Sequence, residues 1–119
     1  MTAPNMFIVY VSDAAASARF YAELFEMSPI FESPAFIVFE LGGGVQLALW
    51  SRGTTEFGVP RTSELCLTLD GGSGEIDERF RQWLGRGATV VKEPHDDVFG
   101  RTFLVADPDG NLIRVAPVD

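Results

Sequence analysis

Few residues of this sequence could carry out acid–base or nucleophilic chemistry, since the chain has a single histidine, His95, and a single cysteine, Cys66. His95 lies beside Asp96 and Asp97 in a segment that we expect to be a loop. We interpret it as a solvated surface residue, with a general base as the alternative because histidine titrates near neutrality. We interpret Cys66 as a small core residue rather than a nucleophile, because the only histidine lies in a distant loop.

Residues 107–110, Asp-Pro-Asp-Gly, begin like a calcium-binding loop, but the glycine spacing is wrong and the required glutamate does not follow. We predict a turn instead. Alternating apolar runs at residues 102–106 and 112–116 flank this turn, so the segment is expected to form a β-hairpin. Arg114 lies in its second strand, and an arginine cannot ligate a metal ion.

The first half of the chain has the pattern βαβββ. Residues 6–12 are β-branched and aromatic, Asp13 is placed to cap a helix, and residues 14–26 carry apolar side chains at helical spacing. Three further strands are expected at 29–32, 35–41 and 45–50, the last two joined by a glycine turn at 42–44. Residues 51–60 lack periodicity and suit a linker or flap.

The second half repeats this pattern, with a helix expected at residues 75–84. Its strands are expected at 64–69, 89–92, 102–106 and 112–116. We therefore predict an α+β fold of two βαβββ modules, residues 1–58 and 59–119, whose mixed sheets form a cupped surface with both helices outside.

Composition limits the classes of partner and environment. The 119 residues are 46% hydrophobic and 12% aromatic, enough for one domain or two small half-domains. A formal net charge of −8 argues against nucleic acid or an anionic membrane as partner. One cysteine allows no intramolecular disulfide and no cysteine zinc site. With no basic or long apolar N-terminal region, we expect a cytoplasmic protein without a membrane span.

The order and spacing of several motifs resemble a known superfamily across the whole chain. They are Val11-Ser12-Asp13, Ser17, Phe20-Tyr21 and the Asp-Pro-Asp-Gly-Asn segment at 107–111. The chain resembles the vicinal oxygen chelate superfamily of glyoxalases, extradiol dioxygenases and bleomycin-resistance proteins. More narrowly, it is similar to the phenazine-antibiotic resistance proteins of that superfamily, which are binding proteins. The segments that carry this similarity are residues 10–12, 48–51, 92–94, 97–104 and 113–115.

The resemblance also suggests where a metal would bind. Metal-dependent members take four ligands, usually His, Gln or Glu, from the first, fourth, fifth and eighth strands. The corresponding residues here are Met6, Gln46, Glu64 and Arg114. One carboxylate and one amide beside a fixed positive charge make a poor site for a divalent cation, so we expect neither metal nor cofactor. Instead, Arg114 should pair with Glu64, while remaining able to meet a ligand carboxylate or carbonyl.

Strand alternation then predicts the lining of the cup. If these four positions face inward, so should Ile8, Tyr10, Ala48, Trp50, Cys66 and Ala116. Val9, Leu47, Leu49, Leu65, Leu67 and Val115 should face the helices. A flat aromatic ligand could stack on Trp50, although any single Phe could equally fill the core. The predicted ligand-binding residues are Trp50, Tyr10, Phe36, Gln46, Ala48, Phe57, Glu64, Cys66, Phe99 and Arg114.

Two functions follow from these observations. The first is metal-independent binding and sequestration of a planar aromatic small molecule, in particular a phenazine-type antibiotic, by a protein without catalytic residues. The alternative is a glyoxalase-like lyase or isomerase with Glu64 as base and Arg114 as electrophile. Because the four candidate metal positions suit a divalent cation poorly, we favour the binding function over the enzymatic one. Sheet edges that need a partner predict a homodimer, and whether its halves exchange is left open.

Overall fold

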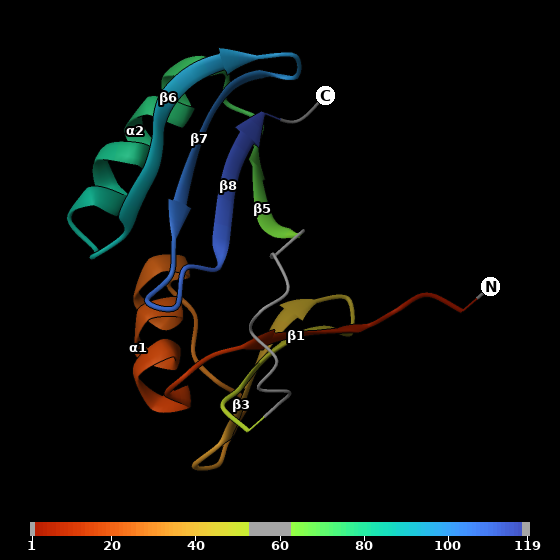
Figure 1. The fold of residues 1–119 in the computed structure, drawn as a ribbon. Helices are drawn as coiled ribbons and strands as arrows, with labels where there is room; N and C mark the ends of the chain where they lie inside the picture. Colours follow the sequence, from red (N-terminus) through yellow and green to blue (C-terminus); the bar gives the residue numbers. More distant parts are fainter. Residues whose placement is uncertain (1, 53–62, 118–119) are drawn as a thin grey trace. The chain divides into compact units, whose positions relative to one another are not determined.

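A computed structural model describes residues 2–52 and 63–117 of the chain. The chain divides into two compact units, one containing residues 2–52 and the other residues 63–117 (Figure 1). The expected module boundary, between residues 58 and 59, lies outside the described residues. Neither helix in the two described ranges is both long and apolar enough to cross a membrane.

The first unit is a four-stranded mixed sheet with one helix. Its strands follow the order β1-β4-β3-β2; β1 runs parallel to β4, and the other pairs are antiparallel. The predicted helix cap is confirmed, because the Asp13 carboxylate accepts a hydrogen bond from the Ala16 amide at 3.1 Å. The elements are β1 (Met6–Tyr10), α1 (Ala14–Phe25), β2 (Phe31–Glu32), β3 (Phe36–Gly42) and β4 (Val45–Trp50).

The second unit repeats this topology. Its sheet has the order β5-β8-β7-β6; β5 runs parallel to β8, and the other neighbouring pairs are antiparallel. The elements are β5 (Glu64–Leu69), α2 (Ser73–Leu84), β6 (Thr89–Asp97), β7 (Gly100–Ala106) and β8 (Leu112–Pro117). The predicted α+β class and the two βαβββ patterns are therefore confirmed.

Each helix packs on its own sheet, and alternation separates the side that faces the helix from the opposite side, which we call the open side of the sheet. In the second unit, Trp83 of α2 meets Phe103 of β7 edge-on at 5.7 Å, and Phe103 lies opposite Val115 of β8. Arg114 therefore lies on the open side, because neighbouring side chains of a strand point to opposite faces. In the first unit, Leu47 and Leu49 are buried as predicted, with 2% and 0% of their surfaces exposed.

Strand β6 differs most from expectation. The sequence predicts a strand that stops at Lys92 and places His95 in a loop, which is wrong: β6 continues through Pro94 to Asp97. Proline is tolerated because β6 is an edge strand and its pairing with β7 is irregular between Lys92 and His95.

The turn between β7 and β8 forms as predicted. The Asp107 carboxylate accepts hydrogen bonds from the backbone N–H groups of Asp109 at 2.9 Å and Asn111 at 2.8 Å. It also accepts one from the Asn111 side-chain amide at 2.8 Å. This carboxylate organises the turn from within and fixes the register of the hairpin that carries Arg114.

Candidate ligand-binding site

Three aromatic residues lie side by side across the open side of the first sheet. Tyr10 of β1 and Phe36 of β3 are both in register with Trp50 of β4. The Trp50 ring lies 6.1 Å from the Tyr10 ring at a tilt of 36°, and 6.2 Å from the Phe36 ring in an edge-on arrangement. We call Tyr10, Trp50 and Phe36 the aromatic row.

The Trp50 indole is the member of the aromatic row on which a further flat ring could stack. Within residues 2–52 and 63–117, no ring stacks parallel to the Trp50 indole. Phe31 extends the row, with its ring 6.5 Å from that of Phe36 and 53% of its surface exposed. Sequence reasoning missed Phe31, although it lies in a predicted strand; its pairing with Val38, which brings it beside Phe36, depends on register.

The other predicted ligand-binding residues of the first sheet, Gln46 and Ala48, differ in how exposed their side chains are. Gln46 is half-buried and lies opposite Met6 of β1, on the same side as the aromatic row by alternation. Ala48 lies on that side too but is 0% exposed, so a ligand could contact it only after a neighbouring group moved.

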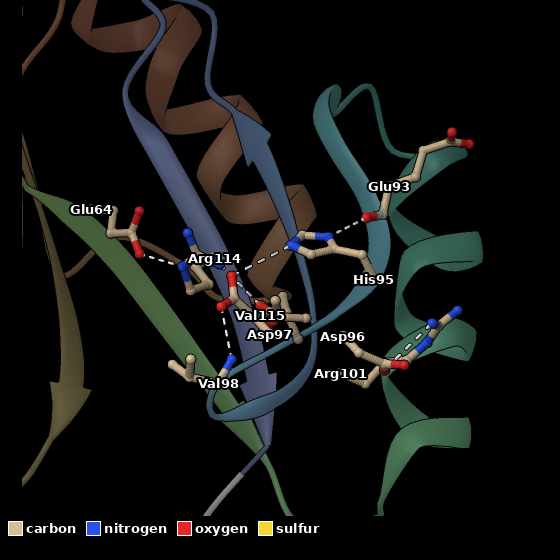
Figure 2. Close-up of polar contacts among 10 residues, drawn as sticks. Glu64, Glu93, His95, Asp96, Asp97, Val98, Arg101, Arg114 and Val115 are labelled. Carbon is tan, nitrogen blue, oxygen red and sulfur yellow. Dashed lines mark hydrogen bonds and ion pairs between the residues drawn. The ribbon is translucent and has the colours of Figure 1, made fainter.

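A second group of residues lies on the open side of the other sheet. The ion pair expected between Glu64 of β5 and Arg114 of β8 is present, with Arg114 Nε donating to the carboxylate (Figure 2). Nη1 of Arg114 also donates to Thr102 Oγ1 of β7 at 3.2 Å. The Phe99 ring lies 5.4 Å from the guanidinium carbon, within cation–π range. We call Glu64, Phe99, Thr102 and Arg114 the polar cluster.

Thr102 holds the polar cluster to the sheet, and sequence reasoning missed it. Its side chain is completely buried and donates from Oγ1 to the carbonyl of Val115 at 2.6 Å. The same oxygen accepts the Arg114 hydrogen bond, so the arginine is oriented from two strands. The sequence could have indicated it, because strand alternation in the predicted hairpin places Thr102 on the same side of the sheet as Arg114.

His95 and Asp97 lie in the strand and hairpin that lead to Phe99. Nδ1 of His95 is 2.7 Å from the carbonyl of Glu93, and Nε2 is 3.9 Å from the Asp97 carboxylate (Figure 2). The His95 side chain is 32% exposed. A hydrogen bond to a carbonyl places the proton on Nδ1 and leaves Nε2 facing the carboxylate.

Cys66 is opposite Arg114 in register and is exposed. The expectation of a core residue is therefore wrong: β5 is an edge strand, and alternation turns Cys66 away from α2. Partial burial raises the pKa of the Cys66 thiol, and the Glu64 carboxylate raises this pKa further, while Arg114 lowers it. A thiol with a raised pKa is a poor nucleophile at neutral pH.

The side chains at the four candidate metal positions do not fit a divalent cation. Glu64, the only carboxylate of that set, already accepts a hydrogen bond from Arg114, which brings a permanent positive charge. Within the described parts of the chain, no three His, Cys, Asp or Glu side chains gather closely enough to hold a metal ion.

The structure brings the predicted residues together in two groups. Tyr10, Phe36 and Trp50 are in mutual register on one sheet; Glu64, Cys66, Phe99 and Arg114 lie close together on the other. Phe57 lies outside the described residues. The first group offers aromatic surface, and the second offers directed N–H donors beside an aromatic ring.

Comparison with known proteins relates the chain to one superfamily. Residues 3–115 match the model of the Glyoxalase/Bleomycin resistance protein/Dioxygenase superfamily. The chain is 41% identical to the phenazine antibiotic resistance protein EhpR of Enterobacter agglomerans, an alignment that covers 98% of this chain and 92% of that protein.

Solved structures share the fold. Protein ATC0852 from Agrobacterium tumefaciens is 36% identical, with a TM-score of 0.84, over 100% of this chain and 99% of that one. A glyoxalase-related enzyme from Fulvimarina pelagi is 24% identical, with a TM-score of 0.83, over 99% of this chain and 89% of that one. The second likeness is one of fold alone.

Proposed function

The chain belongs to the Glyoxalase/Bleomycin resistance protein/Dioxygenase superfamily, and from this membership we propose that it is a cytoplasmic antibiotic-binding protein. Its ligand is a planar aromatic small molecule of the phenazine type. The protein protects by lowering the free concentration of that molecule, and it needs no metal or cofactor to do so.

The observation that carries the proposal is the similarity of nearly the whole chain to EhpR, a phenazine antibiotic resistance protein. The geometry of the open sheet faces agrees with it. A three-ring heterocycle buries most of its area by stacking, and the aromatic row presents an indole without a parallel partner among the described residues. In the second unit, the polar cluster by itself offers N–H donors suited to acceptor atoms of such a ligand.

An enzyme that uses Glu64 as a general base is less well supported. One oxygen of the Glu64 carboxylate, Oε1, already accepts the N–H of Arg114, so only part of the group remains for a substrate proton. Cys66 is a protonated thiol at neutral pH, because its pKa is raised. Binding requires neither group to react.

The proposal can be tested by expressing the protein in a phenazine-sensitive bacterium, with the Trp50→Ala variant at a matched level as control. Sequestration is stoichiometric, so we expect protection to rise in proportion to the amount of wild-type protein. The phenazine recovered from the culture should be chemically unchanged. Absence of protection would contradict the proposal, and conversion of the phenazine would support the lyase or isomerase alternative.

A further inference from the structure

We propose that Glu64 makes the polar cluster selective for the charge of the ligand. The favoured ligand is a planar aromatic molecule whose substituent is an uncharged hydrogen-bond acceptor, such as a carboxamide, ester or ketone. An aromatic carboxylate of the same shape is rejected. This inference rests on the proposed binding function and specifies the class of ligand that the site accepts.

Arg114 retains donors for such an acceptor. A guanidinium carries N–H groups on Nε, Nη1 and Nη2. Within residues 2–52 and 63–117, Glu64 engages Nε and Thr102 engages one N–H of Nη1, which leaves the N–H groups of Nη2 and the second of Nη1. The side chain is 19% exposed, so these donors are largely shielded but reachable.

The charge of Arg114 is already neutralised. Glu64 binds Nε directly, and its side chain is only 33% exposed, so solvent screens this ion pair incompletely. A second carboxylate at this position would meet a neutral pair rather than a free cation. The donors can therefore satisfy a neutral acceptor fully, whereas an anion would also meet the repulsion of Glu64.

Two other cations of the second unit, Arg101 and Lys92, are poorly placed to draw an anion to Arg114. Arg101 is engaged by Asp77 at 2.9 Å and lies 3.7 Å from the Asp96 carboxylate. Lys92 of edge strand β6 lies on the same side of the sheet as Arg114, because both are in register with Leu104 of β7; it is exposed to solvent and lies two strands away from Arg114. Asp97 lies in the hairpin that carries Phe99, and the whole chain has a formal charge of −8. Asp97 and the net negative charge disfavour an anionic ligand at Arg114, and Arg101 adds no free cation to oppose them.

Phe99 adds the requirement for a planar molecule. Its ring lies 5.4 Å from the guanidinium carbon and is 39% exposed. A flat ligand whose acceptor meets Arg114 would lie near this exposed ring. The polar cluster therefore combines an aromatic surface with N–H donors that belong to a neutral ion pair.

The test compares three matched probes: phenazine, phenazine-2-carboxamide and phenazine-2-carboxylate. The 2-position is chosen because a substituent there cannot hydrogen-bond to its own ring nitrogen. Each probe is titrated calorimetrically at pH 7.5 and low ionic strength into the wild type, Glu64→Gln and Glu23→Gln. Glu23 is exposed on α1 of the first unit, so its variant removes one negative charge and leaves every residue of the polar cluster unchanged.

The wild type and Glu23→Gln should bind the carboxamide roughly tenfold or more tightly than the carboxylate. In Glu64→Gln, the new amide oxygen still accepts from Arg114 Nε, and the carboxylate should gain roughly tenfold in affinity while the carboxamide changes less than about twofold. A wild type that binds the carboxylate as tightly as the carboxamide would overturn the inference. So would an unchanged preference in folded Glu64→Gln.

A variant-free measurement covers the case in which Glu64→Gln does not fold. If the preference is electrostatic, about 0.5 M salt should narrow the difference between the two substituted probes in the wild type. A difference in affinity between these two probes that does not change with salt concentration would overturn the inference. Binding of all three probes with equal affinity would contradict only the selectivity, whereas failure of all three to bind would contradict the proposed function as well.

Discussion

Glu64 and Arg114 meet diagonally across strands β5 and β8: Glu64 is in register with Leu112, and Arg114 is in register with Cys66, yet the carboxylate accepts the Nε hydrogen bond. Arg114 also donates to the buried Thr102. The pair is therefore part of a three-strand network. Removing one member affects the sheet as well as the candidate site.

Arg114→Ala should lower the free energy of unfolding by about 1–3 kcal/mol, because it strands the partly buried Glu64 carboxylate and removes a partner of Thr102. Urea denaturation followed by circular dichroism measures this loss. Arg81→Ala is the matched control, since Arg81 pairs with Glu78 where the side chains are 65% and 58% exposed. That variant should lower the free energy of unfolding by less than about 1 kcal/mol. Equal losses in the two variants would contradict a structural role for the Glu64–Arg114 pair.

The sequence predicts the fold well because its main signals are local. Alternating apolar residues mark the strands, Asp13 caps α1, and Asp107 organises the turn of the β7–β8 hairpin. The repeated order of elements then predicts the shared topology of the two units. The start of α2 was two residues too late, at residue 75 rather than Ser73, because Gly72 and Gly74 resemble a break although only Gly72 lies outside the helix.

The candidate site was less predictable because it depends on register and on pairing. Alternation placed Trp50 and Arg114 on the open faces, and the Glu64–Arg114 pair followed from the need of a buried arginine for an anion. Thr102 and Phe31 were missed because their contacts arise between strands. His95 was wrongly predicted to lie in a loop because the pairing of strands could not be foreseen. A strand can contain Pro94 only because β6 is at the edge of its sheet.

The protein should purify without a stoichiometric divalent metal, because Arg114 places a permanent positive charge against the one carboxylate of the candidate metal positions. Elemental analysis of the purified protein measures the metal content. Chelators should leave the thermal midpoint of unfolding unchanged. One tightly held zinc, nickel or iron ion per chain would disprove this prediction.

Cys66 should react slowly with iodoacetamide at pH 7.5, because burial and Glu64 raise its pKa and keep the thiol protonated. The rate measured against pH should have its midpoint above that of a free cysteine thiol measured alongside. Glu64→Gln removes a charge that raises the pKa, so it should shift the midpoint down and speed alkylation at neutral pH. A midpoint that does not respond to this substitution would show that Glu64 does not act on the thiol.

We propose that the protein is a homodimer. Strand β1 ends the order of its sheet and carries Met6, Phe7 and Ile8, which are 38%, 51% and 43% exposed. An apolar edge strand is a surface that a second copy could cover. Sedimentation velocity at micromolar concentration should give the mass of two chains, and a monomer at that concentration would refute the proposal.

Trp50→Ala should weaken phenazine binding by roughly tenfold or more, on the order of 1.4 kcal/mol, because the ligand loses its stacking surface. The fold should persist, since Trp50 lies at the end of β4 and is only half-buried. Trp50→Phe is the matched control and should keep most of the affinity, because it retains an aromatic face.

The proposed binding function is tested by a calorimetric titration of phenazine into the wild-type protein and Trp50→Ala, followed by recovery of the ligand for mass analysis. Circular dichroism verifies that both proteins are folded. We expect saturable binding to the wild type, unchanged phenazine after release, and at least roughly tenfold weaker binding to the variant. Absence of binding to the wild type, or equal affinity in a folded Trp50→Ala protein, would contradict the proposed binding function.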